Sequence, residues 1–79
     1  MPFYLFIWND SIEGHLAAHG VRPDEFEEVV CDPDEVNESR SSGRAIAFGG
    51  TSTGKYLACV YELLDDTTVL PVTAYEVED

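Results

Sequence analysis

The chain has 79 residues, which is enough for one domain over 1–79 and no more. Sixteen Asp and Glu residues outnumber four Lys and Arg residues and give a formal net charge of −12. Because clustered Lys and Arg side chains dominate binding to nucleic-acid phosphates, this charge argues against nucleic-acid binding by the isolated chain and makes a basic protein its natural electrostatic partner.

The chain opens with an aromatic and β-branched segment, residues 3–8, which predicts a buried strand. No basic residue precedes this segment, and it is too short for a signal-peptide core or a membrane span. Two cysteines, Cys31 and Cys59, provide no disulfide framework and are expected to be reduced and buried. We therefore expect a cytoplasmic protein without membrane contact.

A first short helix is predicted after this strand. Asp10 is its expected N-cap, with Glu13 completing a capping box, and Gly20 ends it by accepting a left-handed conformation. The apolar side of this helix is expected to hold Ile12, Leu16 and Ala17.

A second short helix is predicted to begin at Pro23, which suits the first helical position. Asp32-Pro33 ends it, because the residue before a proline is disfavoured in helical conformation. Val21 and Phe26 have the spacing of a hydrophobic staple. Its core face is expected to hold Phe26, Val29 and Val30.

The second half of the chain predicts an antiparallel meander of three to four strands. A polar segment, 35–43, holds a short strand at best, and three apolar runs follow at 44–50, 55–63 and 67–77. Pro71 cannot donate to a strand ladder, so its strand is an edge or is bulged there. The apolar spacing within 57–64 also fits a helix, but the β-branched and aromatic content favours a strand. The fold class is therefore α+β, with an N-terminal strand, two short helices and this meander.

Pairing of Thr51 with Lys55 would place Arg44 opposite Glu62, where a cross-strand ion pair would occupy Arg44. The same register sends alternate residues of each strand to opposite faces. One face would hold Ile46, Phe48, Ala58 and Val60, and the other Ala47, Leu57, Cys59 and Tyr61. The last strand would offer Leu70, Val72 and Ala74 on one side and Val69, Thr73, Tyr75 and Val77 on the other.

Both faces of the predicted sheet are therefore apolar, and two short helices cover only one of them. An apolar patch left open marks an interaction surface. We expect the second face to bind a protein partner or a second copy of the chain. The alternative is that the sheet curls and partly covers itself.

Residues 49–55 fit the first part of the phosphate-loop pattern, G-x-x-x-x-G-K. Tyr56 stands where a Ser or Thr would hold magnesium, and a strand is predicted where the pattern requires a helix. We interpret the segment as a hairpin loop that uses Gly for positive φ. His15 and His19 share a helix face, but no third ligand is indicated. No cofactor and no metal site are predicted.

An RNA-cleaving site needs cations near the scissile phosphate and a group that moves a proton. The candidate catalytic residues are His19, Arg40, Arg44, Lys55 and Tyr75. The hairpin register separates Lys55 from Arg44 by about 20 Å at ~3.3 Å per residue. Lys55 and Arg44 can therefore bind the same phosphate only if strand 67–77 or a partner protein bridges the distance between them.

Several short motifs stand in the order found in a known family. Trp8 opens the first helix, His19-Gly20-Val21 ends it, and an acidic helix runs through Phe26-Glu27-Glu28-Val29. Later come Gly50-Thr51, Gly54-Lys55 and Pro71-Val72-Thr73-Ala74. Over roughly residues 6–75, this order resembles the BrnT-type toxins.

The resemblance implies a RelE-like ribonuclease fold, metal-independent RNA cleavage and membership of a bacterial toxin–antitoxin pair. Members of the family are inhibited by a cognate antitoxin with a DNA-binding module. The chain departs from the family at Ala18, where members carry Lys, and at Tyr75, where they carry Arg. Two functions follow: a toxin-like ribonuclease that uses the candidate residues above, and a non-catalytic module that binds protein or oligomerises on the same fold.

Overall fold

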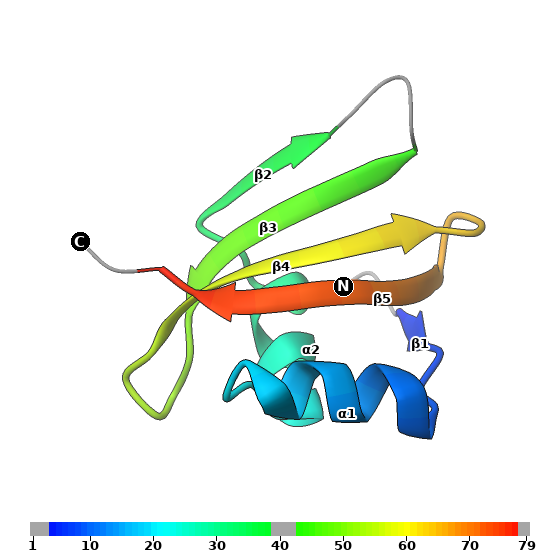
Figure 1. Ribbon diagram of the computed structural model, residues 1–79. Helices are drawn as coiled ribbons and strands as arrows, with labels where there is room; N and C mark the ends of the chain where they lie inside the picture. The colour runs from blue at the N-terminus through cyan, green and yellow to red at the C-terminus, as the bar shows by residue number, and fades with distance from the viewer. Residues whose placement is uncertain (1–3, 39–42, 78–79) are drawn as a thin grey trace.

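Five strands and two helices make up the part of the chain that the computed structural model describes, residues 4–38 and 43–77 (Figure 1). They follow in the order β1 (Leu5–Phe6), α1 (Asp10–Ala18), α2 (Pro23–Cys31), β2 (Glu35–Glu38), β3 (Arg44–Gly50), β4 (Tyr56–Leu63) and β5 (Thr68–Glu76). The strands form one sheet in the order β1-β5-β4-β3-β2. The predicted antiparallel meander is confirmed for β2 to β5, and β1 adds to β5 in parallel.

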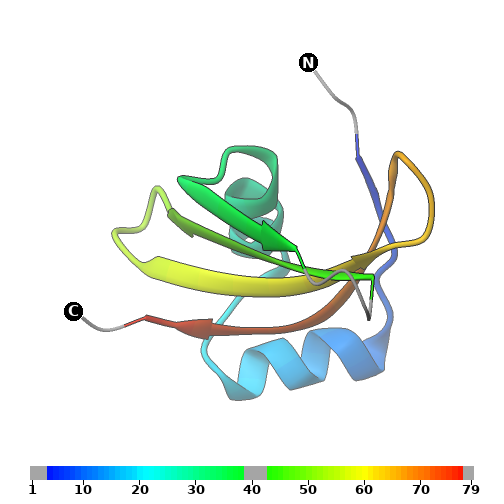
Figure 2. The same ribbon diagram turned by 90° about the horizontal axis from the view of Figure 1, so that it is seen from above.

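Both helices lie beneath the sheet, so the view from above shows bare strands over α2 (Figure 2). α2 packs against β3 and β4, and α1 runs along β5. At the opposite edge of the sheet, β2 is exposed along its whole length. The prediction that the two helices cover one face only is confirmed. No helix described here is long and apolar enough to cross a membrane.

The first strand is shorter than predicted. In the described part of this segment, residues 4–8, only Leu5 and Phe6 pair, with Thr68 and Val69 of β5, and Leu5 is 66% exposed. The rings of Phe6 and Trp8 also contact helix α2. Phe6 and Trp8 both meet Phe26 edge-on, with ring centroids 6.3 and 5.6 Å away. The segment is therefore a short ladder attached to an aromatic cluster.

Helix α1 is capped by Asn9 and not by Asp10. The Oδ1 atom of Asn9 accepts a hydrogen bond from the backbone N–H of Ile12 at 2.8 Å, while Asp10 is already helical. The prediction that Gly20 ends the helix is confirmed, since Gly20 has φ +75°. The N–H of Gly20 bonds the carbonyl of Ala17 at 3.0 Å, and that of Val21 bonds Leu16 at 2.9 Å, which is a Schellman motif.

Helix α2 follows the sequence prediction closely. Pro23 is its first residue, and the helix ends at Cys31 with Asp32 as C-cap. The core beneath the sheet is continuous with both helices, and Val21 and Phe26 are buried in it. Its members are Leu16, Val21, Phe26, Val29, Val30, Ala45, Ala47, Leu57, Cys59, Tyr61, Val69 and Ala74. The prediction that Cys31 is buried is wrong, because Cys31 is exposed, and Ala17 of the predicted apolar side of α1 is exposed as well.

A bulge in β5 changes which residues of that strand share a face. Tyr61 faces Pro71, whereas Val60 faces Thr73, so Val72 has no residue opposite it. This confirms the bulged alternative for Pro71. It overturns the alternation predicted for 67–77, because Ala74 turns to the helices with Val69, and Tyr75 turns away from them.

The two glycines of the α1 region give a matched pair of substitutions. A Cβ at Gly14 or at Gly20 meets no atom within 4 Å, but only Gly20 has positive φ. We expect Gly14→Ala to raise the free energy of unfolding by about 0.5–1 kcal/mol. We expect Gly20→Ala to lower it by about 1–2 kcal/mol. Urea denaturation measures both, and shifts of the same sign would contradict the assignment of the helix end.

The two thiols should react at different rates. Burial raises the pKa of Cys59 to about 12, so its thiolate is scarce as well as inaccessible. Cys31 is exposed, although desolvation and then Glu27 raise its pKa also. A thiol reagent should modify one cysteine in the native protein and the second only as fast as the protein unfolds. Fast modification of both would contradict the buried position of Cys59.

Candidate functional site

A buried carboxylate, Glu25, joins three separate parts of the chain. It is 3% exposed and lies in the first turn of α2. One oxygen accepts the N–H of Arg22 at 3.1 Å and lies 3.3 Å from Nζ of Lys55. The other oxygen accepts the hydroxyl of Thr53 at 2.6 Å. Glu25 therefore connects the start of α2 with the loop between β3 and β4.

The β3–β4 loop is held against α2 by further hydrogen bonds. Glu28 accepts the N–H of Ser52 at 2.9 Å, one helical turn along from Glu25. Thr51 pairs with Lys55 through a backbone bond of 2.8 Å, which confirms the predicted register. Nζ of Lys55 also donates to the carbonyl of Gly20 at 2.9 Å, where α1 ends. The loop thus fixes the junction between the two helices.

The likeness of residues 49–55 to a phosphate loop is explained by this hairpin. Gly54 has φ +91° and its N–H bonds the carbonyl of Thr51 at 3.1 Å, as in a turn. The segment leads into β4 and not into a helix. The interpretation as a hairpin loop is confirmed. Lys55 is directed to Glu25 on the helix side of the sheet, where a carboxylate already neutralises it.

The two described arginines, Arg22 and Arg44, do not form a cationic cluster with Lys55. Arg22 forms an exposed ion pair with Asp24 at 3.4 Å. Arg44 lies opposite Glu62 in the predicted register, at the end of the sheet away from Lys55. The predicted ion pair is absent, because within residues 4–38 and 43–77 no carboxylate approaches Arg44 within 4.0 Å. Arg40 lies outside the described residues.

The two histidines of α1 lie beside β5. The rings of His15 and His19 are 5.1 Å apart in an edge-to-face arrangement, and Nε2 of His15 lies 2.9 Å from the hydroxyl of Thr73. This bond fixes how α1 is aligned with β5. Among the described residues, no three His, Cys, Asp or Glu side chains are grouped as metal ligands.

His19 and Tyr75 lie at the same level of this seam. α1 and β5 run in the same direction (Figures 1 and 2). From His15 to His19 the helix advances about 6 Å at 1.5 Å per residue, and from Thr73 to Tyr75 the strand advances about 6.6 Å at 3.3 Å per residue. Both side chains are exposed, Tyr75 by 43%. The two residues share a level along the seam, with His19 on the helix and Tyr75 on the sheet face turned away from the helices.

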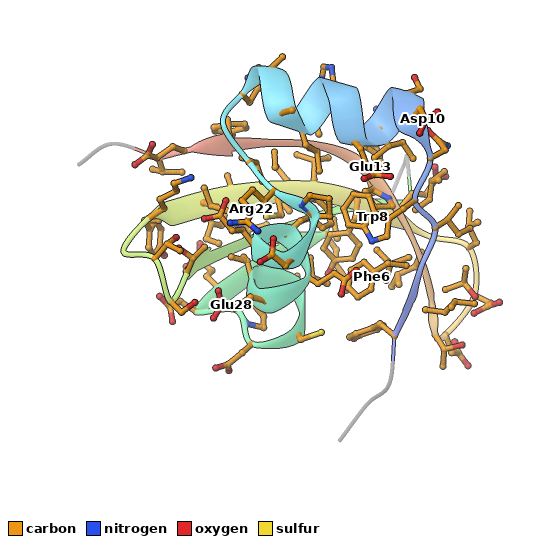
Figure 3. The ribbon with its side chains drawn as sticks, turned by 90° about the horizontal axis from the view of Figure 1, so that it is seen from below. Phe6, Trp8, Asp10, Glu13, Arg22 and Glu28 are labelled. Atoms are coloured by element: carbon orange, nitrogen blue, oxygen red, sulfur yellow. The ribbon has the colours of Figure 1, made fainter. Side chains whose placement is uncertain are left out.

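A shallow groove of about 580 Å³ lies where the two helices meet. Its walls include Glu13 and Ala17 of α1, the start of α2 with Arg22 and Pro23, and Lys55. Figure 3 shows Glu13 and Arg22 on this helical side of the molecule. Both cations of the groove are already paired with carboxylates, and Glu13 adds a further negative charge. The groove therefore has no unpaired positive charge for an anion.

Trp8, the first of the family motifs, has a structural role. Its indole Nε1 donates to Glu27 at 2.6 Å, which ties the start of α1 to α2. Its ring also stacks on Phe6 with centroids 6.4 Å apart. Figure 3 shows Phe6 and Trp8 side by side next to α2. This motif and the Glu25–Lys55 pair hold the helices in place.

The features described define a class of small α+β proteins in which a helix pair covers one face of a mixed sheet. No protein-family model and no curated protein matches the sequence. Among solved structures, the chain is similar to the crystal structure of the Brucella abortus ribonuclease toxin BrnT, with a TM-score of 0.72 and 12% sequence identity. The alignment covers 100% of each chain. The chain therefore has a BrnT-like fold, which confirms the fold expected from the motifs.

Glu25 gives a test of how the site is held together. The hydrogen bond from Thr53 is the largest cause that lowers the pKa of Glu25, with Arg22 and Lys55 adding to it against the desolvation that raises it. A carboxyl whose pKa is lowered by folding stabilises the protein above its unfolded pKa, near 4.5, and loses that contribution as pH falls through the folded value. We expect Glu25→Gln to cost about 2–4 kcal/mol at pH 7.

The control is Asp24→Asn, which alters an exposed pair next to Glu25 and should cost less than about 1 kcal/mol. Urea denaturation from pH 7 down to pH 3 checks both variants. The difference between wild type and Glu25→Gln should shrink toward low pH, since the wild-type carboxylate is then protonated. A constant difference would contradict the role assigned to its charge.

Proposed function

We propose that this chain is a toxin-family member of a bacterial toxin–antitoxin pair and that it cleaves RNA without a metal. The observation that carries the proposal is the likeness of the whole chain to the ribonuclease toxin BrnT, at a TM-score of 0.72. In the proposal the imidazole of His19 takes the proton of a ribose 2′-hydroxyl, whose oxygen attacks the phosphorus. The hydroxyl of Tyr75 gives a proton to the leaving 5′-oxygen, and the products are a 2′,3′-cyclic phosphate and a 5′-hydroxyl.

Arg44 is the described cation that suits contact with the RNA strand, because no carboxylate in the described residues pairs with it. Tyr75 faces Ala58, whereas Arg44 faces Glu62, so the two lie four residues apart along β4, about 13 Å at 3.3 Å per residue. In the proposal Arg44 therefore binds a phosphate next to the scissile one. Lys55, paired with Glu25, is assigned to the scaffold.

A second function is favoured by a different observation, the scarcity of unpaired positive charge. Lys55 and Arg22 are both paired with carboxylates, and the net charge of −12 repels RNA. On this fold a non-catalytic relative would bind its protein partner and leave RNA intact. The two functions differ in one measurement, which is RNA cleavage by the purified chain.

The ribonuclease proposal is tested by Tyr75→Phe and His19→Ala. Each should lower RNA cleavage at low salt by about 10²-fold or more, because each removes a proton-transfer group. Expression of the wild type should arrest growth, and either variant should relieve the arrest. The matched control is Tyr61→Phe, which deletes the same hydroxyl on the helix-facing side of the sheet and should leave cleavage unchanged.

The reaction products are checked for a 2′,3′-cyclic phosphate in the presence of a chelator. If wild-type protein leaves RNA intact at low ionic strength, where attraction between charges is greatest, the non-catalytic function replaces the ribonuclease. Full activity in both His19→Ala and Tyr75→Phe would show that the reaction occurs elsewhere on the fold.

A further inference from the structure

The sheet face turned away from the helices, named here the open face, is apolar. It is defined by Ile46, Phe48, Ala58, Val60, Leu70 and Tyr75. None of these residues belongs to the core beneath the sheet. Within residues 4–38 and 43–77, neither helix lies over the middle of this face (Figure 2), and α1 reaches only its β5 border, through the hydrogen bond between His15 and Thr73.

Curvature of the sheet buries only a small part of the open face. Ala58 is fully buried, because Phe48 and Tyr75 lie on either side of it in neighbouring strands. The larger residues Ile46 and Val60 are partly exposed, and Tyr75 is 43% exposed. The alternative of a sheet that covers itself therefore accounts for one small residue and leaves the larger ones in contact with solvent.

Carboxylates surround this apolar strip on two sides. Glu35 of β2 faces Phe48, and Glu62 lies at the other end of β4 beside the turn that carries Asp65 and Asp66. Hydrogen bonds from Thr67 and Thr68 lower the pKa of Asp65, so its carboxyl stays charged at neutral pH. Arg44 is the basic residue that the described part of this face contributes.

The charge selects between the two occupants expected for the open face. A second copy would bring another net charge of −12 against the first, and repulsion of like charges opposes that assembly. A partner with apolar residues on one side and Lys or Arg on the other meets both the strip and its acidic margin. The observations therefore favour a basic partner over self-association.

We propose that the open face binds an amphipathic, basic segment of a partner protein. Its apolar side chains contact Ile46, Phe48 and Val60, and its cations reach Glu35 and Glu62 at the margin. This inference names a surface and a chemistry for the protein partner, and it rests on the proposed function only for the statement that the chain works in a pair.

The experiment measures binding of a synthetic 18-residue helical Leu/Lys peptide to the full chain. A Leu/Glu peptide of the same pattern is the charge control. The first variant is Val60→Lys, in the middle of the open face, and its matched control is Leu64→Lys, at a 53% exposed position in the β4–β5 turn. Val60→Thr, nearly isosteric and suited to a strand, serves as a second variant that keeps the fold.

We expect the Leu/Lys peptide to bind and to shift backbone amide resonances in β3, β4 and β5. Val60→Lys should weaken its affinity at least tenfold, Val60→Thr by a smaller factor, and Leu64→Lys by less than twofold. Binding should also weaken several-fold between 50 and 500 mM salt, and the Leu/Glu peptide should not bind.

Several results would overturn the inference. They are absence of Leu/Lys binding, equal affinity in Val60→Lys and Leu64→Lys, or resonance shifts confined to the helices. A dimer in analytical ultracentrifugation that Val60→Lys dissociates would assign the face to a second copy. These outcomes are separate from those of the proposed function, because a chain without RNA cleavage or growth arrest would still bind the peptide, and an active ribonuclease could fail to bind it.

Discussion

The arrangement of the molecule depends on the carboxylate of Glu25, which is buried beside the one lysine of the chain. Lys55 donates a hydrogen bond to the carbonyl of Gly20, just after the end of α1. Glu25 itself accepts hydrogen bonds from the N–H of Arg22 at the start of α2 and from the hydroxyl of Thr53 in the β3–β4 loop. Removing one partner would leave charge buried without compensation, which is far more costly than losing an exposed ion pair. This single group therefore sets how the helix pair meets the sheet, and with it the position of α1 beside β5.

The position of α1 beside β5 places the proposed residue His19 along the strand that carries Tyr75. α1 lies against β5 through Leu16 and the His15–Thr73 bond, so its last turn reaches the exposed end of the strand. In a chain with four cations, structural use of Lys55 removes a large share of the positive charge from any substrate. The likeness to the BrnT toxin favours a ribonuclease, whereas the net negative charge favours a non-catalytic protein-binding module, and a measurement of RNA cleavage distinguishes the two.

Much of the fold was accessible from the sequence because local signals agreed with one another. Pro23, Gly20 and the staple of Val21 with Phe26 located the helices, and the pairing of Thr51 with Lys55 fixed the hairpin register. The site was less accessible. Glu25 has the position of an ordinary acidic residue in a first helical turn, and only the tertiary approach of Lys55 and Thr53 explains its burial. The sequence did not show which side chains of β5 change face at the bulge at Val72, because strict alternation also fits an apolar strand.

The edge strand β2 affects how the molecule meets other molecules. Its four residues are exposed and include Glu35 and Glu38, so a neighbouring molecule that added a strand there would bring its own carboxylates against them. An apolar sheet surface that stays uncovered exposes a protein to fibrillar aggregation. The acidic border of β2 reduces that hazard by discouraging sheets from growing across molecules.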